Sequence, residues 1–136
     1  MPKEIWINLP VKDVTKAKNF FVSLGFIFNE THSNESMAAM QVSDKNIALM
    51  LFEAGMFSHV NQLPVTDTKS SSEVLFSLDA ASKEEVDEWA KKAEAAGANV
   101  FAKPTTIQGW MYGCAFADLD GHRWNVLYMD MSKMNG

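Results

Sequence analysis

One asparagine stands in the middle of a predicted strand near the end of the chain, in the stretch FADLDGHRWNVLYMD (residues 116 to 130). The turn DLDGH separates the apolar run WMYGCAF from the alternating run RWNVLYM, a pattern that predicts a β-hairpin. In the return strand Asn125 shares a face with Arg123 and Leu127, whereas Trp124 and Val126 take the other face. Asn125 is therefore either a ligand-binding position without a charge or a polar residue at the solvated end of a core.

The other reactive side chains are scattered. His32, His59 and His122 fall in predicted loops or turns, and no two of them share a face at the spacing of metal ligands. Cys114 lies in a predicted strand with no base or oxyanion site nearby in the sequence, so we interpret it as a small buried apolar residue. The chain carries no phosphate-binding loop, no G-x-S-x-G and no H-E-x-x-H. The common covalent mechanisms are therefore unsupported.

Length and composition narrow the class of protein. The 136 residues are enough for one domain with its own core. A formal net charge of −5, with the 12 basic residues dispersed, argues against a nucleic-acid partner. A single cysteine, no apolar N-terminal segment and no apolar run approaching ~18 residues predict a cytoplasmic protein without a membrane partner.

The first half of the sequence predicts a strand, a helix, a short strand and a hairpin. EIWINLPV alternates like a strand, and Asp13 can cap the helix VTKAKNFFVSLG, which Gly25 ends. FIFN is a short strand, and the runs MAAMQV and NIALMLFE are joined by SDK as a hairpin. The polar stretch TDTKSSS (66 to 72) follows and indicates a linker.

The second half repeats this order. EVLFSL is a strand, and SKEEVDEWAKKAEAAG is a helix with a capping box at Ser82 and Glu85. NVFA is a short strand that precedes the closing hairpin. The pairs Val14 and Val86, and Gly25 and Gly97, are each 72 residues apart. We therefore predict an α+β fold in a single domain, 1–136, made of two βαβββ modules at about 4–54 and 72–130, with a linker at 55–71.

Two segments carry a resemblance to a known family. INLPVKDVTKAKNFFVSLGF at the front and FADLDGHRWNVLYMD at the back resemble the glyoxalase / bleomycin-resistance / extradiol-dioxygenase family, also called the vicinal oxygen chelate fold. The resemblance covers nearly the whole chain and implies that each module's curled sheet forms half of a cup. It indicates the fold more strongly than the activity, because proteins of one fold carry many activities.

The resemblance also implies where a metal would be held. Metal-dependent members place their ligands on cup-facing positions of the first, fourth, fifth and eighth strands, which correspond here to Trp6, Leu51, Glu73 and Asn125. An indole and an aliphatic side chain have no donor for a metal, so we expect no tightly bound metal cofactor. The alternative is a divalent ion held by an altered set, Glu53, Glu73 and Asn125.

These residues leave three hypotheses open. The first is a homodimeric protein that binds a small organic molecule in its cup, with Trp6 as a stacking plane and Glu73 and Asn125 as polar anchors. The second is a metal-dependent lyase or isomerase of the glyoxalase kind, with Glu73 as catalytic base or ligand and Glu53 as its partner. The third is an interaction module that pairs through its sheet edges.

The predicted ligand-binding residues share the strand faces that would line the cup. Without a ligand, the same side chains would simply fill it. The set is Trp6, Asn8, Leu51, Glu73, Leu75, Asn125 and Leu127, with Leu49 and Ser77 on the same faces and Trp110, Met111 or Tyr112 at the rim.

Overall fold

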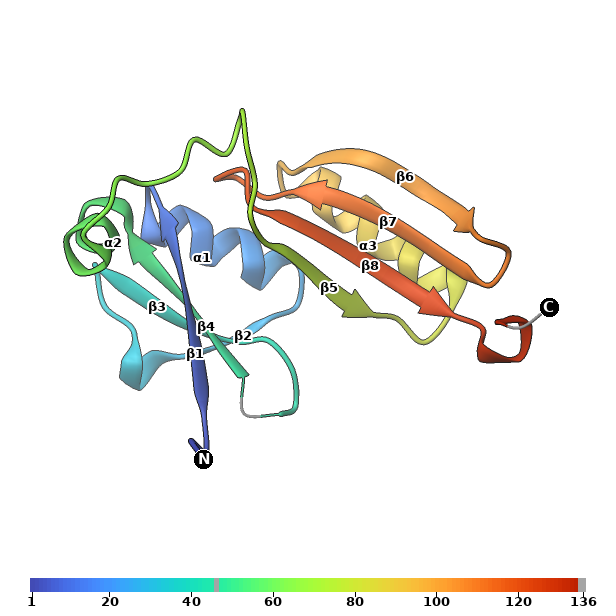
Figure 1. Ribbon diagram of the computed structural model, residues 1–136, viewed down its shortest axis with the longest axis horizontal. Helices are drawn as coiled ribbons and strands as arrows, with labels where there is room; N and C mark the ends of the chain where they lie inside the picture. Colours follow the sequence, from blue (N-terminus) through green and yellow to red (C-terminus); the bar gives the residue numbers. More distant parts are fainter. Residues whose placement is uncertain (46, 135–136) are drawn as a thin grey trace. The chain divides into compact units, whose positions relative to one another are not determined.

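The computed structural model describes residues 1–45 and 47–134 (Figure 1). Its internal contacts divide the chain into two compact units, Met1–Thr66 and Asp67–Gly136, called unit 1 and unit 2 below. No helix among the described residues is long and apolar enough to cross a membrane.

Unit 1 is a four-stranded mixed sheet with one long helix on one face (Figure 1). The strands lie in the order β1-β4-β3-β2, with β1 parallel to β4 and the other neighbours antiparallel. A short helix, α2, follows the last strand. The elements are β1 (Ile5–Val11), α1 (Val14–Ser23), β2 (Ile27–Asn29), η1 (Glu30–His32), β3 (Met37–Gln41), β4 (Ile47–Glu53) and α2 (Ala54–Asn61).

Unit 2 has the same architecture. Its strands lie in the order β5-β8-β7-β6, again with one parallel pair, β5 and β8. Equal strand orders in the two units confirm the predicted pair of βαβββ modules. The elements are β5 (Leu75–Asp79), α3 (Lys83–Ala95), β6 (Asn99–Ile107), β7 (Met111–Ala117), β8 (Arg123–Met129) and η2 (Met131–Lys133).

The two long helices begin and end as their sequences predict. Asp13 accepts a hydrogen bond from the Lys16 backbone N–H at 3.0 Å, and Ser82 accepts one from Glu85 N–H at 3.1 Å. Gly25 and Gly97 follow the last turns with φ of 101° and 103°. Because an L side chain is strained in that left-handed region, glycine is the residue that ends both helices cleanly.

The helix-covered face of each sheet forms the core. In unit 1, Val11, Leu49, Leu51 and Met40 are at most 2% exposed beneath α1. In unit 2 the Trp124 indole is fully buried, with its ring 4.7 Å from Phe76 and stacked on Phe116 at 6.4 Å between centroids. Apolar burial on this scale is the main stabilising contribution in a domain of this size.

The turn DLDGH is anchored by a buried carboxylate. Asp118 is 7% exposed, and its Oδ1 accepts backbone N–H bonds from Asp120 and His122, each at 3.0 Å. Its Oδ2 accepts a bond from the Trp124 indole N–H, also at 3.0 Å. The turn and the largest core side chain of unit 2 are thus tied to one residue.

Three local features differ from the sequence-based expectation. The second strand of unit 2, β6, predicted as the short NVFA, extends to Ile107 and includes Pro104. Proline is tolerated because β6 is an edge strand and needs no ladder hydrogen bond on its outer side. The predicted linker contains α2, and the loop after β2 contains η1.

The face of β4 also differs. We predicted Leu49 and Leu51 on the same face as Trp6 and Asn8, but the structure buries both leucines under α1, at 1% and 0% exposure. Leu51 is the cross-strand partner of Leu9, on the helix-covered face. The run IALMLFE has no polar alternation, so the sequence alone could not assign its two faces.

Candidate functional site

The open face of the unit 1 sheet carries a hollow of about 690 Å³. Three cross-strand rows form its base. They are Trp6, Ala48 and Gln41; Asn8, Met50, Ala39 and Asn29; and Phe52 with Met37. Trp6 and Asn8, both predicted from the sequence, therefore lie together, whereas Leu51 lies on the opposite face. A concavity with mostly apolar walls and a few amide groups is the usual form of a small-molecule site.

The polar side chains on the strands of this hollow are neutral amides, and two of them bond to the backbone. Asn29 Oδ1 accepts a hydrogen bond from Thr31 N–H at 3.0 Å, and Gln41 Nε2 donates to the Ser43 carbonyl at 3.0 Å. These bonds orient both amides. The titratable lining residues lie outside the strands, namely Glu4 before β1, His32 in η1, and Asp44 and Lys45 after β3.

Sequence reasoning missed most of the lining. Ala39, Ala48, Met50 and Phe52 reach the open face because Ala48 pairs with Trp6 and Met50 pairs with Asn8. The signal was available only through the alignment of β1 with β4, since in a parallel pair the partners of one open-face residue take the same face.

The open face of the unit 2 sheet carries four of the other predicted residues. Leu75 pairs with Arg123, and Ser77 with Asn125, so these positions share the face opposite the Trp124 indole. Leu127 lies across Gly113, where a Cβ atom would come within 2.6 Å of the leucine Cδ2. The face predicted for Leu75, Asn125 and Leu127 is thus the one that the structure gives them.

Asn125 has an unusual environment. Its Oδ1 is buried, and no group in residues 1–45 or 47–134 donates a hydrogen bond to it. Its cross-strand partners are Ser77 on one side and Ala115 on the other. A buried amide oxygen without a donor costs about 1–3 kcal/mol. The amide therefore has an unused acceptor that a ligand N–H or O–H could satisfy.

The two predicted carboxylates, Glu53 and Glu73, have different surroundings. Glu53 caps α2, and its two oxygens accept the N–H groups of Gly55 and Met56 at 2.9 Å each, which lowers the pKa of its carboxyl. Glu73 is exposed and precedes β5. Among the described residues no group of three or more His, Cys, Asp or Glu side chains could hold a metal ion.

Trp6 belongs to unit 1, whereas Glu73 and Asn125 belong to unit 2. The prediction that these three residues line one cup stays a prediction. The donor set itself does not fit a metal, because the indole has no lone pair for it, Leu51 faces the helix, and Glu53 serves as a cap.

Two other residues considered in the sequence analysis, Cys114 and Tyr112, both contact α3. The Cys114 Sγ lies 3.8 Å from the Val86 carbonyl oxygen of α3, and burial raises the pKa of this thiol to about 11. It is therefore neutral near pH 7, which agrees with its interpretation as a small buried residue. The Tyr112 hydroxyl donates to Asp87 of α3 at 2.7 Å, so this ring faces the helix rather than a rim of the open face.

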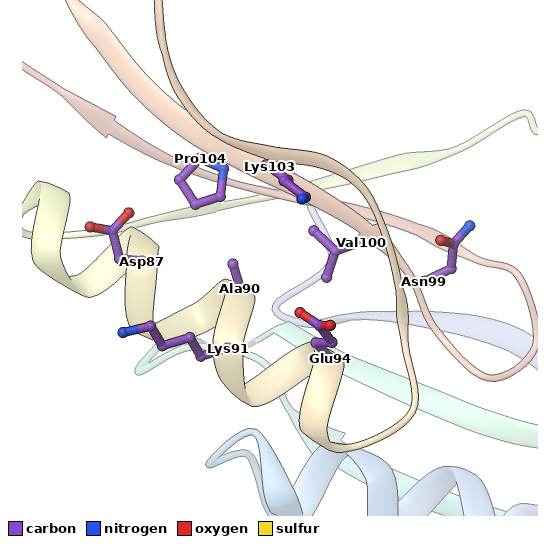
Figure 2. Close-up of a pocket in the computed structure, with 8 residues that line it drawn as sticks. All are labelled: Asp87, Ala90, Lys91, Glu94, Asn99, Val100, Lys103 and Pro104. Carbon is purple, nitrogen blue, oxygen red and sulfur yellow. The ribbon is translucent and has the colours of Figure 1, made fainter.

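A second hollow, of about 400 Å³, lies between α3 and β6 (Figure 2). Asp87, Lys91 and Glu94 extend from α3, and Lys103 and Pro104 of β6 are also part of the lining. The hydrogen bond to Asp87, followed by burial, raises the pKa of Tyr112 at the edge of this region. Its charges are balanced, and none of the predicted ligand-binding residues lines it.

Comparisons with protein families and solved structures show which known proteins this chain resembles. The family model described as "Glyoxalase/Bleomycin resistance protein/Dioxygenase superfamily" matches residues 5–126. The chain is similar to the solved structure of a hypothetical protein, SA1046, from S. aureus, with 35% identity, a TM-score of 0.83 and 94% of each chain covered.

Two further solved structures share the fold at lower identity. One is a glyoxalase/bleomycin resistance protein/dioxygenase family enzyme from Burkholderia phytofirmans PsJN, with 19% identity, a TM-score of 0.77, and 91% of this chain and 96% of that chain covered. The other is a lactoylglutathione lyase from Agrobacterium tumefaciens, with 21% identity, a TM-score of 0.68, and 94% and 95% covered. A search of curated proteins found no match.

Proposed function

The chain belongs to the glyoxalase/bleomycin resistance protein/dioxygenase superfamily, and we propose that within this family it binds a small organic molecule without a tightly bound metal ion. The observation that carries the proposal is the hollow of about 690 Å³ on the open face of unit 1, where the Trp6 side chain is 65% exposed. An exposed indole beside apolar side chains offers a stacking surface for a ligand.

The metal-free part of the proposal is supported by the donor set. A catalytic zinc site uses three protein donors of the imidazole, thiolate or carboxylate type. Three of the positions that the resemblance implies for metal ligands hold Trp6, Glu73 and Asn125, and the open face of β4, the fourth strand, offers Met50 and Phe52. Glu73 is the one charged group among them, and a single carboxylate with one amide binds divalent ions weakly.

We expect the purified chain to carry well under one divalent ion, and Ni²⁺, Zn²⁺ or Mn²⁺ to leave its melting temperature essentially unchanged. A ligand that binds only the native state raises that temperature by mass action, so a true site would be visible. Elemental analysis after dialysis and thermal unfolding with each ion measure both quantities. A stoichiometric ion that Glu73→Gln removes, together with metal-dependent isomerisation of a hemithioacetal, would establish the lyase alternative instead.

A homodimer is also part of this proposal. In unit 1, Val60 of α2 is 64% exposed and Leu63, just after it, is 63% exposed, and adjoining apolar side chains of this kind are common at protein interfaces. We expect sedimentation equilibrium to give twice the chain mass of 15.2 kDa. Leu63→Asp should shift the protein toward monomer, whereas the control Ile27→Asp, at an exposed position of β2, should not. A monomer at every concentration would contradict the dimer.

A further inference from the structure

We propose that the ligand of the unit 1 hollow is a flat, uncharged aromatic ring system, such as a fused bicyclic ring, and that Ala39 and Ala48 select it. The inference rests on the proposed function, because it concerns the ligand of the same hollow. It goes further in naming the ligand chemistry and the residues that select it.

The two alanines lie at the centre of the open face of the sheet. Ala48 stands between Trp6 of β1 and Gln41 of β3, and Ala39 stands between Met50 of β4 and Asn29 of β2. Directly opposite residues on neighbouring strands have Cβ atoms about 5 Å apart, and diagonal neighbours about 7 Å. Ala39 and Ala48 are diagonal neighbours on β3 and β4. We call the surface formed by their two methyl groups the floor of the hollow; it is about as wide as an aromatic ring.

Alanine is an unfavourable choice for the middle of a sheet. Strand interiors favour β-branched and aromatic residues, which fill the pleated surface and contact their cross-strand neighbours. Ala39, which is 7% exposed, and Ala48, which is half-buried, make fewer such contacts than larger residues would. The hollow of about 690 Å³ is the space that results. A ligand that lies on the floor would restore the missing contacts.

In unit 2 the space above a small residue of the open sheet face is filled by a side chain of the same unit. Gly113 also lies centrally on an open sheet face, in β7, and pairs with Leu127 of β8. The leucine folds over the glycine so closely that a Cβ there would lie 2.6 Å from its Cδ2 and 2.9 Å from the Val126 carbonyl oxygen. In unit 1, Ala39 and Ala48 both line the hollow directly.

The chemistry of the walls favours a flat ring. Trp6 presents its indole at one side of the floor, and an aromatic ring gains from offset or edge contact with it. Met37 and Met50 add thioethers, which contact aromatic rings favourably. A puckered ring system of the same carbon number would lose the planar contact with both the indole and the floor.

The floor also selects against charge. The three rows at the base of the hollow contain apolar and amide side chains. The titratable lining residues lie outside the strands and are Glu4, His32, Asp44 and Lys45. Placing an ionised group on the floor would remove water from it without supplying a counter-charge, which costs free energy. Neutral hydroxyl or amide substituents can instead bond to the side chains of Asn8 or Gln41.

Three probes of one skeleton test the inference with the full-length chain by isothermal titration calorimetry. They are naphthol, which is flat and neutral; decahydronaphthol, which is neutral and puckered; and naphthalenesulfonate, which is flat and anionic. We expect naphthol to bind at least about tenfold more tightly than either of the others. Equal affinity for naphthol and decahydronaphthol, or tighter binding of the sulfonate, would overturn the inference.

Substitutions on the floor test the role of the alanines. Ala48→Leu fills the floor and is expected to weaken naphthol binding at least about tenfold, whereas Ala48→Ser, which stays small, should remain within about threefold of wild type. Ala95→Leu, at an exposed position of α3, is the matched control and should bind as wild type does. Because Ala48 is only half-buried, the leucine can be accommodated without unfolding, and thermal unfolding verifies this.

The outcomes separate the inference from the proposed function. Unchanged naphthol binding by Ala48→Leu overturns the role of the floor while ligand binding itself stands. If wild type binds no naphthol but binds members of a fragment library rich in sugars, acids and amines, the ligand class is wrong and the proposed function survives. If no compound of either set binds, both fail.

Discussion

Asp118→Ala is expected to lower the free energy of unfolding by about 3 kcal/mol near neutral pH. The carboxylate accepts the backbone N–H groups of Asp120 and His122 and the indole N–H of Trp124, each at 3.0 Å. Losing the acceptor of a buried donor costs about 1–3 kcal/mol, and Trp124 is fully buried. Urea unfolding followed by circular dichroism measures the difference.

A double-mutant cycle isolates the buried bond. Trp124→Phe removes the indole donor, so Asp118→Ala should cost about 1 kcal/mol less in that background than in wild type. Asp79→Ala, at an exposed position in β5, is the control and should change stability by less than about 0.5 kcal/mol. An unaltered cost of Asp118→Ala in the Trp124→Phe background would show that the indole bond contributes nothing.

The pH dependence of the same difference has a definite sign. Burial raises the pKa of the Asp118 carboxyl, although the nearby His122 and the donated hydrogen bonds partly offset this. The folded state therefore holds the proton more tightly than the unfolded chain does. The contribution of Asp118 is fully present below the ordinary carboxyl pKa of 3.8 and declines as pH rises through the raised value. The stability gap between wild type and Asp118→Ala should thus narrow over that range.

The fold was largely predictable because its signals are local. Asp13 and Ser82 start the helices and Gly25 and Gly97 end them, in each case through backbone bonds or a left-handed φ that the residue type itself favours. In the first part of β8, residues 123–126, polar and apolar residues alternate, so the sequence alone assigns the faces of Trp124 and Asn125.

The site was less predictable because it depends on strand pairing. The run IALMLFE is apolar throughout, and only its alignment with β1 places Met50 on the open face and Leu51 under the helix. Glu53, a member of the alternative metal set, ends β4 and caps α2, a helix too short to leave a clear hydrophobic period. At both positions tertiary contacts, rather than local pattern, decide the direction of a side chain.

Substitutions at Asn125 are expected to change stability in opposite directions. Asn125→Leu has nearly the same volume and removes the buried Oδ1 that lacks a donor within the described part of the chain, so the free energy of unfolding should rise by about 1 kcal/mol. Asn125→Asp replaces the amide with a carboxylate in the same partly buried place and should lower it by about 2 kcal/mol at pH 7. Chemical unfolding of the three proteins measures the spread.

The pH dependence of Asn125→Asp provides its internal control. Burial raises the pKa of an introduced carboxyl, so the variant should recover toward wild-type stability as the pH falls below the ordinary carboxyl range and the group is neutralised. Asn125→Leu should show no such recovery, since it has nothing to titrate. A deficit of Asn125→Asp that persists at acid pH would mean that shape, not charge, causes it.

The sign of the leucine result decides what the asparagine is for. A polar residue that makes a structural hydrogen bond stabilises its fold, and its removal lowers the free energy of unfolding. A residue retained for a ligand can lower the stability of the free protein, because its acceptor is satisfied only in the complex. If Asn125→Leu is less stable than wild type, the amide is structural. If it is more stable, the unsatisfied Oδ1 opposite Ser77 and Ala115 is reserved for a ligand donor.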